Sequence, residues 1–349
     1  MTDMLAARLI KAGEPLRIER VAVPEPEEGE ILVKVAACGL CGTDLHLAVD
    51  GDIPVERTPI TLGHEAAGTV VSVGACVTGC RAGDQVAMFP SAFCGECRFC
   101  RVGRHSLCQN SKVYGMARDG ALANYVTAPA RSVVPIPDGV AFDVAAIITD
   151  GVSTPFHALR RRGQLRTGET VAVIGCGGLG THAVILARLM GARTIVAIDT
   201  QPEARERVLD LGADLALDPM NEDAIKAIRS HLGHAGVDLA LEFVGRRETS
   251  ELAIRLLDKA GRAVLVGVGI GRPALPPLLA FVGREQSVIG SFGMDREDIE
   301  DLFSLVAAGR LDLSKSVTAR YPLGEANEAL QRLASKEAGV IRLVVEPGI

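Results

Sequence analysis

Short apolar runs alternate with polar turns along the whole chain, and their character changes near residue 150. Before that point the runs EILVKVAA, GTVVSVG and DQVAMF are separated by turns rich in Gly and Pro. Runs of this length between such turns are typical of antiparallel strands. The first 150 residues therefore predict a β-rich domain.

After residue 150 the apolar runs become nearly continuous. VAVIG, TIVAI, DLALE, AVLVG and SVIG alternate with stretches of helical periodicity such as THAVILARLMG and PEARERVLDLG. Continuous apolar strands are buried on both faces, which requires a parallel sheet covered by helices. This part predicts a doubly wound α/β domain. The tail from about 292 ends in the strand IRLVVEP, which could pair back with the first domain.

A glycine-rich turn joins the first of these parallel strands to its helix. It contains Gly175, Gly177, Gly178, Leu179 and Gly180 in the pattern G-x-G-x-x-G. In this context the glycines allow a tight turn, close approach of a pyrophosphate and close packing of helix on strand, while the helix N-terminus attracts phosphates. The turn predicts a dinucleotide-binding domain.

An acidic residue follows the second parallel strand. Asp199 stands nineteen residues after Gly180, where a carboxylate would accept hydrogen bonds from the adenosine ribose and repel a 2′-phosphate. This favours NAD as the cofactor over NADP. Arg205 and Arg207 keep acceptance of both cofactors open.

Four cysteines lie in one short run with the spacing C-x2-C-x2-C-x7-C. They are Cys94, Cys97, Cys100 and Cys108. Four thiolates in a tetrahedral arrangement are the ligands of a closed, structural zinc site. An iron–sulfur cluster is the weaker alternative, because its commonest run ends in C-P, whereas Gln109 follows Cys108 here. Disulfides are also weaker, because nine cysteines in 349 residues are far below the density of a disulfide scaffold.

Bulk composition restricts the partners and the location. Residues are 48% hydrophobic and 23% charged, with a formal net charge of -6 and no apolar run near the roughly 20 residues of a membrane span. These values disfavour nucleic acid and anionic membranes and favour a small-molecule substrate. The first residues, MTDMLAARLI, lack the pattern of a secretory signal. We expect a reducing compartment, the cytoplasm.

These motifs together resemble the zinc-dependent medium-chain alcohol dehydrogenase family over nearly the full length. CGTDLH, GHEAAGTV, the cysteine run, GCGGLG and Asp199 occur in the family's order and spacing. The resemblance implies a GroES-like β-rich catalytic domain, residues 1–152 and 292–349, and a Rossmann domain, residues 153–291. It also implies two zinc ions per chain, one structural and one catalytic.

The resemblance implies a role for each matching residue. Cys41 and His64 match ligands of the catalytic zinc, and Asp150 occupies the place of the third ligand; from the residues alone, Asp150 is more simply a helix cap. Glu65 matches a carboxylate that can enter the coordination sphere, and Asp44 matches the acid that orients the zinc-bound histidine. The matching proton relay is Thr43 and His46, and the further cofactor contacts are Thr154, behind the nicotinamide, and Arg342, on the pyrophosphate.

The implied activity is hydride transfer between NAD and a primary or secondary alcohol, or the matching aldehyde or ketone. Oxidation of a polyol, or of a cyclic hydroxyl on a carrier-linked substrate, is the alternative, and a non-catalytic NAD-binding redox sensor is a weaker one. Phe89 and Tyr114 flank the cysteine run and are candidates for the substrate cleft. SVIGSFG is expected at a sheet edge, where pairing across a two-fold axis would give a homodimer or homotetramer.

Overall fold

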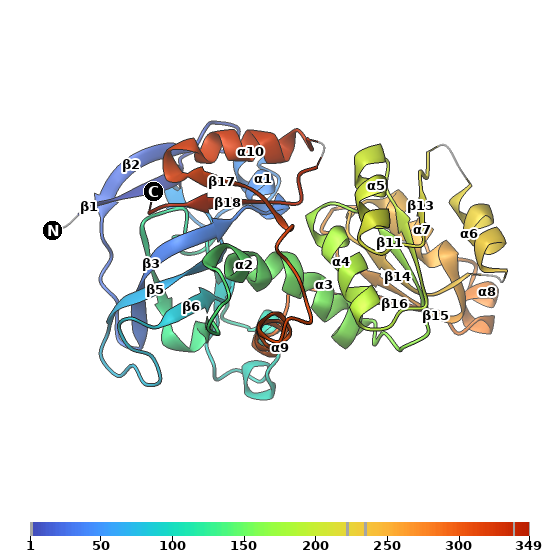
Figure 1. The fold of residues 1–349 in the computed structure, drawn as a ribbon, viewed down its shortest axis with the longest axis horizontal. Coiled ribbons are helices and arrows are strands. Elements are labelled where there is room, and N and C mark those ends of the chain that lie inside the picture. The colour runs from blue at the N-terminus through green and yellow to red at the C-terminus, as the bar shows by residue number, and fades with distance from the viewer. Residues whose placement is uncertain (1–2, 221–222, 234–235, 338, 349) are drawn as a thin grey trace. The chain divides into compact units, whose positions relative to one another are not determined.

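The chain divides into two units in the computed structural model, shown in Figure 1. The first comprises Met1–Ser153 and Met294–Ile349, and the second comprises Thr154–Gly293. The structure describes residues 3–220, 223–233, 236–337 and 339–348. Within them, no helix has the length and apolar composition needed to cross a bilayer.

The first unit is built around β3 (Glu30–Gly39), which pairs with three strands of one sheet. The strand order is β10-β6-β5-β3-β18-β17, with β9 also paired to β3. Most pairs are antiparallel, as predicted; β17 and β18 are parallel. The bounds are β5 (Glu65–Val73), β6 (Gln85–Met88), β9 (Tyr125–Pro129), β10 (Val133–Pro135), β17 (Val317–Pro322) and β18 (Arg342–Glu346).

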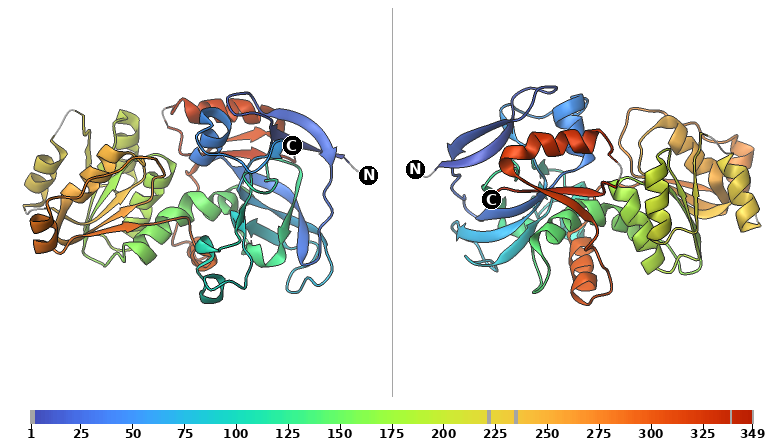
Figure 2. Two further views of the ribbon diagram at one scale, coloured as in Figure 1. Left: turned by 180° about the vertical axis from the view of Figure 1, so that it is seen from behind. Right: turned by 45° about the horizontal axis from the view of Figure 1, so that its top comes forward.

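Smaller elements complete this unit. A three-stranded sheet has the order β2-β1-β4, a two-stranded sheet joins β7 and β8, and α10 packs against β17 and β18 (Figure 2). The strands are β1 (Asp3–Leu9), β2 (Arg17–Ala22), β4 (Ile60–Thr61), β7 (Ser91–Ala92) and β8 (Lys112–Val113). The helices are α1 (Gly42–Leu45), α2 (Phe142–Ile147), α9 (Arg296–Ala307) and α10 (Ala326–Ala334).

The C-terminal tail returns to the first unit, as the sequence predicted. β18 pairs antiparallel with β3, with Val344 opposite Gly39 and Val345 opposite Cys38. Leu343, Val344 and Val345 are fully buried. Burial of these apolar side chains explains why the last strand belongs to the sheet that begins at residue 30.

The second unit is a six-stranded parallel sheet with the order β13-β12-β11-β14-β15-β16. All five residues of β11 are buried, as a strand covered by helices on both faces requires. The strands are β11 (Thr170–Ile174), β12 (Thr194–Ile198), β13 (Leu215–Leu217), β14 (Val237–Glu242), β15 (Leu257–Leu265) and β16 (Ser287–Gly290). The helices are α4 (Gly178–Leu189), α5 (Pro202–Asp210), α6 (Ala224–Leu232), α7 (Arg247–Leu256) and α8 (Leu278–Gly283); α3 (Ser153–His157) begins at the end of the first unit.

The predicted fold class is confirmed, with one strand added. β13 has three residues, of which only Leu217 is buried. A run this short has no hydrophobic period to detect. The sequence pattern therefore did not predict β13.

Candidate active site and metal centres

The four cysteines of the predicted structural site lie together between β7 and β8. Their sulfur atoms all lie within 4.8 Å of one another. Cys94 Sγ is 3.6 Å from Cys108 Sγ and 4.0 Å from Cys100 Sγ, so these are free thiols rather than disulfides. In a tetrahedron with Zn–S bonds of about 2.3 Å, the sulfurs are about 3.8 Å apart. The cysteine lobe, Cys94 to Cys108, thus has the spacing of a zinc site.

Backbone N–H groups also favour thiolates in the cysteine lobe. The amides of Cys100 and Gln109 lower the pKa of Cys97 to about 6, and the amides of Glu96 and Cys97 lower the pKa of Cys94. Burial instead raises the pKa of Cys100 to about 12. A zinc ion needs all four groups deprotonated, and its charge would overcome the cost of burying Cys100 as a thiolate.

The second cluster forms at one end of the central sheet of the first unit. Gly39, the last residue of β3, lies opposite Glu65, the first residue of β5. Cys41 follows the end of β3 and His64 precedes the start of β5, so antiparallel pairing brings them to the same edge. Asp150 joins them from a π-helical turn, Ile148–Val152, that continues α2.

The ligand atoms of this active-site cluster, Cys41, His64, Glu65 and Asp150, lie within 4.8 Å of one another. Cys41 Sγ is 3.3 Å from Asp150 Oδ2, and His64 Nε2 is 3.6 Å from the same oxygen. Cys41, His64 and Glu65 are buried, and Asp150 is half-buried. Asp150 lies within a continuing helix, so the structure does not support the simpler interpretation as an N-terminal cap.

Asp44 supports the cluster from α1. Its Oδ2 accepts a hydrogen bond of 2.9 Å from the Cys41 amide, and its Oδ1 lies 3.8 Å from His64 Nδ1. Both Asp44 Oδ1 and His64 Nδ1 are buried and have no hydrogen-bond partner among the described residues. A carboxylate on the far nitrogen of an imidazole is the usual support of a metal-bound histidine. The role that the resemblance implied for Asp44 stays a prediction.

The protonation states of the cluster fit a cation. Burial raises the pKa of Cys41 and raises that of Glu65 to about 7, the latter despite the charge of Arg342. Burial lowers the pKa of His64, but the Asp44 and Asp150 carboxylates outweigh it and raise that pKa well above its usual range. This cluster places a thiol, an imidazole and carboxylates close together and away from water. Such groups either stay protonated or bind a metal ion in place of the protons. The donor set of sulfur, nitrogen and oxygen suits zinc.

Arg342 lies inside the first unit as a partner of Glu65. The two buried side chains form an ion pair, and Arg342 is 3% exposed. The pairing of β18 with β3 places Arg342 beside the end of β3, which the sequence did not reveal. Its predicted contact with a cofactor pyrophosphate stays a prediction.

Gly39 is required by the position of Glu65. A Cβ built on Gly39 would overlap Glu65 Oε2, whereas a Cβ on Gly42 has nothing within 4 Å. We therefore expect Gly39→Ala to push Glu65 out of place and lower the free energy of unfolding by about 1–3 kcal/mol. Denaturant unfolding measures this, with Gly42→Ala as the matched control. Equal stability of the two variants would contradict the packing described here.

Thr43 and His46 follow Cys41 and lie one helical turn apart, in α1 and directly after it. Thr43 Oγ1 is 3.7 Å from Cys41 Sγ. The side chain of His46 is 39% exposed, and its Nδ1 lies 3.1 Å from Asp52 Oδ1 and 3.4 Å from Asp50 Oδ2. A hydroxyl near the cluster and an imidazole open to water are suitable ends of a proton path.

The glycine-rich turn of the second unit has the predicted context. It links β11 to α4, with Gly175 at φ 85°. A Cβ on Gly180 would overlap the Gly175 carbonyl oxygen, so glycine is needed for the close packing of helix on turn. The helix N-terminus is thereby presented at the carboxyl end of the sheet, where parallel folds of this kind bind dinucleotides.

Asp199 lies at the same carboxyl end of the parallel strands. Its Oδ2 accepts a 2.6 Å hydrogen bond from the Cys176 amide, and its Oδ1 accepts one of 2.8 Å from the Gln201 amide. Arg205 donates to the Asp199 carbonyl oxygen at 2.8 Å, and Arg207 donates to the Cys176 carbonyl oxygen at 2.8 Å. The carboxylate is thus fixed against the glycine-rich turn, with two guanidinium groups nearby.

Three further candidates are buried. Thr154 lies in α3 and is 4% exposed. Phe89 packs on the Phe93 ring with centroids 5.3 Å apart, and Tyr114 is fully buried in the core of the first unit. Tyr114 fills that core rather than lining a cleft, so that expectation was wrong. Sequence adjacency to the cysteine run did not reveal which aromatic side chains point inward.

Comparison with known proteins covers most of the chain. Residues 27–138 match the alcohol dehydrogenase GroES-like domain, and residues 178–308 match the zinc-binding dehydrogenase family. An alcohol dehydrogenase from Geobacillus stearothermophilus is 37% identical over 334 residues, which is 95% of each chain. A sorbitol dehydrogenase from Bacillus subtilis is 31% identical over 349 residues, covering 99% of this chain and 98% of that protein.

Solved structures extend the likeness to the fold. A zinc-binding dehydrogenase from Sinorhizobium meliloti, bound to NADP, superposes with a TM-score of 0.90 at 33% identity, covering 99% of this chain and 100% of that one. Both the cysteine lobe and the active-site cluster are groups of ligand atoms that could hold a metal ion. The chain belongs to the zinc-dependent medium-chain alcohol dehydrogenase family.

Proposed function

We propose that this zinc-dependent NAD(P) dehydrogenase oxidises a primary or secondary alcohol, or reduces the matching aldehyde or ketone. The juxtaposition of the buried Cys41 and His64 with the half-buried Asp150 carries the proposal. A relative named as an alcohol dehydrogenase is 37% identical to this chain, against 31% for the sorbitol dehydrogenase, which favours simple alcohols.

The proposed zinc ligands are Cys41, His64 and Asp150. Glu65 forms an ion pair with Arg342 and is proposed as an additional ligand that can enter the coordination sphere. Bound zinc supplies a Lewis acid that stabilises negative charge on the substrate oxygen. Asp44 orients the His64 ring from the side opposite the ligand nitrogen. Three protein ligands leave a fourth position for substrate, as in other catalytic sites.

Thr43 and His46 are the proposed proton path. The Thr43 hydroxyl would take the proton of the alcohol, and the exposed His46 would release a proton to water. The exposure of His46 and its carboxylate neighbours Asp50 and Asp52 support this role.

A substrate panel tests the proposed activity. We expect NADH absorbance to rise with primary or secondary alcohols, to stop after zinc chelation and to return when zinc is restored. Inactivity with every alcohol and carbonyl compound tried, in protein shown to hold zinc, would instead favour a non-catalytic sensor of NAD(H).

Polyol oxidation is the second candidate, supported by the sorbitol dehydrogenase among the relatives. Sorbitol and a cyclic alcohol in the same panel separate the two proposals. A higher kcat/KM for sorbitol than for any monohydric alcohol would favour the polyol, and the reverse would favour the simple alcohol.

NAD is the proposed cofactor in preference to NADP, because the Asp199 carboxylate would repel a 2′-phosphate. Asp199→Gly should reduce the ratio of kcat/KM for NAD over NADP at least about tenfold. Arg205 and Arg207, already at this edge, would then face the phosphate without a competing carboxylate. Steady-state kinetics with both cofactors measure the ratio, and an unchanged ratio would remove Asp199 from the account.

A homodimer or homotetramer is the proposed assembly. β16 is an edge strand of the second unit's sheet, and Leu278, Leu279 and Val282 of α8 are exposed. Edge strands and apolar patches are both disfavoured on monomers. Light scattering on the purified protein should give two or four chains, and a monomer at micromolar concentration would refute this.

A cytoplasmic location is also proposed. The nine cysteines are all free, and both proposed zinc sites need reduced thiols. Reducing compartments keep thiols in that state.

A further inference from the structure

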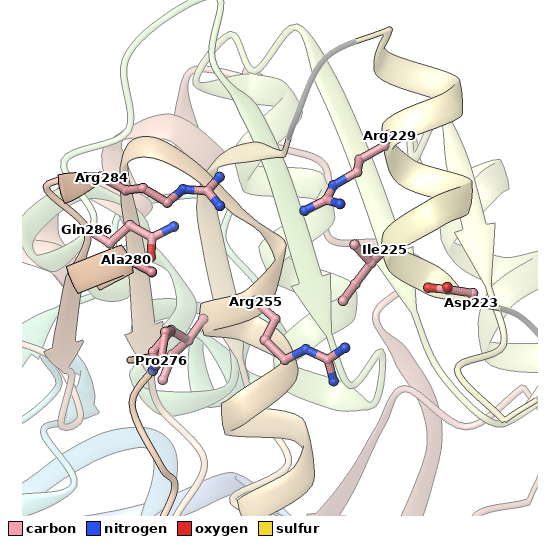
Figure 3. Close-up of a pocket in the computed structure, with 9 residues that line it drawn as sticks. Asp223, Ile225, Arg229, Arg255, Pro276, Ala280, Arg284 and Gln286 are labelled. Carbon is pink, nitrogen blue, oxygen red and sulfur yellow. The ribbon is translucent and has the colours of Figure 1, made fainter. Parts of the chain in front are cut away.

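A pocket of about 370 Å³ opens in the second unit and is lined by no residue of the two metal-ligand clusters or of the glycine-rich turn. It is lined from α6, from the end of α7, from α8 and from the residues before β16 (Figure 3). Pockets that hold small ligands start at roughly 300 Å³. Its size therefore suits a small organic molecule.

The pocket and the glycine-rich turn lie at opposite ends of the parallel strands. Gln286, which lines it, precedes the first residue of β16, and the pocket residue Arg255 comes just before the first residue of β15. Gly175 and Asp199 follow the last residues of β11 and β12. Since all these strands are parallel, the pocket is at their amino ends and the nucleotide turn at their carboxyl ends. The two sites are distinct.

Positive charge predominates in this pocket. Its lining includes three arginines, Arg229, Arg255 and Arg284, and one carboxylate, Asp223, in a chain whose net charge is -6. The Asp223 side chain also accepts a hydrogen bond from the Lys226 amide at the start of α6. Figure 3 shows the guanidinium groups of Arg229 and Arg284 directed toward each other. Like charges so arranged attract an anion.

Part of the lining is fixed in place. Arg284 Nη2 and Gln286 Nε2 each donate to the Leu257 carbonyl oxygen at 3.1 Å, and Arg284 Nη2 lies 3.9 Å from Asp258 Oδ1. Arg284 Nε is buried and has no hydrogen-bond partner within the described ranges. The contacts with Leu257 and Asp258 hold the Arg284 and Gln286 side chains at the pocket wall.

Arg255 contributes a second available cation. It is exposed and, among the described residues, makes no hydrogen bond and no ion pair within 4.0 Å; its charge acts on the Glu251 carboxylate. The apolar side chains of Ile225, Ile254 and Pro276 complete the wall. The pocket thus combines an anion site with a small apolar surface.

We propose that this pocket binds a small phosphate monoester. Its phosphoryl group would lie among the three guanidinium groups, whose planar forks match phosphate oxygens, and its organic part would lie on the apolar wall. The charge of about −2 on such an ester would be attracted by these guanidinium groups.

Calorimetric titration of the full-length protein with glycerol 3-phosphate tests the proposal, with glycerol as the uncharged control. We expect saturable binding of the phosphate ester that persists when NADH is saturating, and no binding of glycerol. Arg255→Gln should raise Kd at least about tenfold. Arg310→Gln, an exposed arginine of the first unit, should leave Kd unchanged.

Three results would overturn the proposal: no saturable binding, loss of binding when NADH is saturating, or the same Kd in Arg255→Gln as in the unaltered protein. Arg229→Gln provides a second variant on a different helix in case the first fails to fold. NADH binding, which the proposal leaves unchanged in both variants, reports that each is folded.

Discussion

Replacing Cys41 or His64 by alanine should abolish turnover while leaving the protein folded. Each side chain is a proposed zinc ligand and lies where β3 ends or β5 begins, outside the paired part of the sheet. Loss of the ion removes charge stabilisation worth several kcal/mol, so kcat/KM should fall at least about 10³-fold. Metal analysis should show the zinc content falling from two ions per chain to one.

Cys38 provides the matched control. It stands three positions before Cys41 and is fully buried, and burial raises the pKa of its thiol well above the usual range. Among the described residues Cys38 belongs to no group of converging ligand atoms, so its buried thiol is a packing group. Cys38→Ala should keep both zinc ions and most of the turnover. Retained turnover in Cys41→Ala, or zinc loss in Cys38→Ala, would contradict the proposed ligand set.

Replacing Cys97 by alanine should have the second largest effect, on stability rather than on chemistry. Its thiol is one of four sulfurs that converge in the cysteine lobe, which otherwise has little regular structure. Because binding of a structural zinc ion contributes directly to folding, the variant should lose at least about 3 kcal/mol of unfolding free energy. Thermal unfolding with metal analysis measures this.

Cys80 gives the control for the second prediction. It is a half-buried, free thiol in a turn outside both clusters. Cys80→Ala should keep two zinc ions per chain and nearly the original stability. If Cys97→Ala were as stable as Cys80→Ala, the cysteine lobe would not be a structural metal site.

Local patterns in the sequence predicted the parts of the molecule that local geometry determines. The cysteine lobe spans fifteen residues, and the glycine-rich turn adjoins both its strand and its helix, so spacing alone indicated each. The antiparallel first unit, the parallel second unit and the return of the last strand followed from hydrophobic pattern.

Contacts between distant segments could not be predicted in the same way. The Glu65–Arg342 pair joins residues 277 positions apart and depends on the register between β18 and β3. Asp150 resembled a helix cap because its sequence does not show that α2 continues through it. The arginine-lined pocket draws on three separate helices, which no single stretch of sequence displays.

X-ray absorption at the zinc edge tests the central claim most directly, using Cys97→Ala protein that retains one zinc ion per chain. The account predicts that this ion has one sulfur ligand at about 2.3 Å, from Cys41, with nitrogen and oxygen ligands at about 2.0–2.2 Å. Three or more sulfur ligands would place the ion in the cysteine lobe and leave Cys41 and His64 without a metal, contradicting the proposed active site.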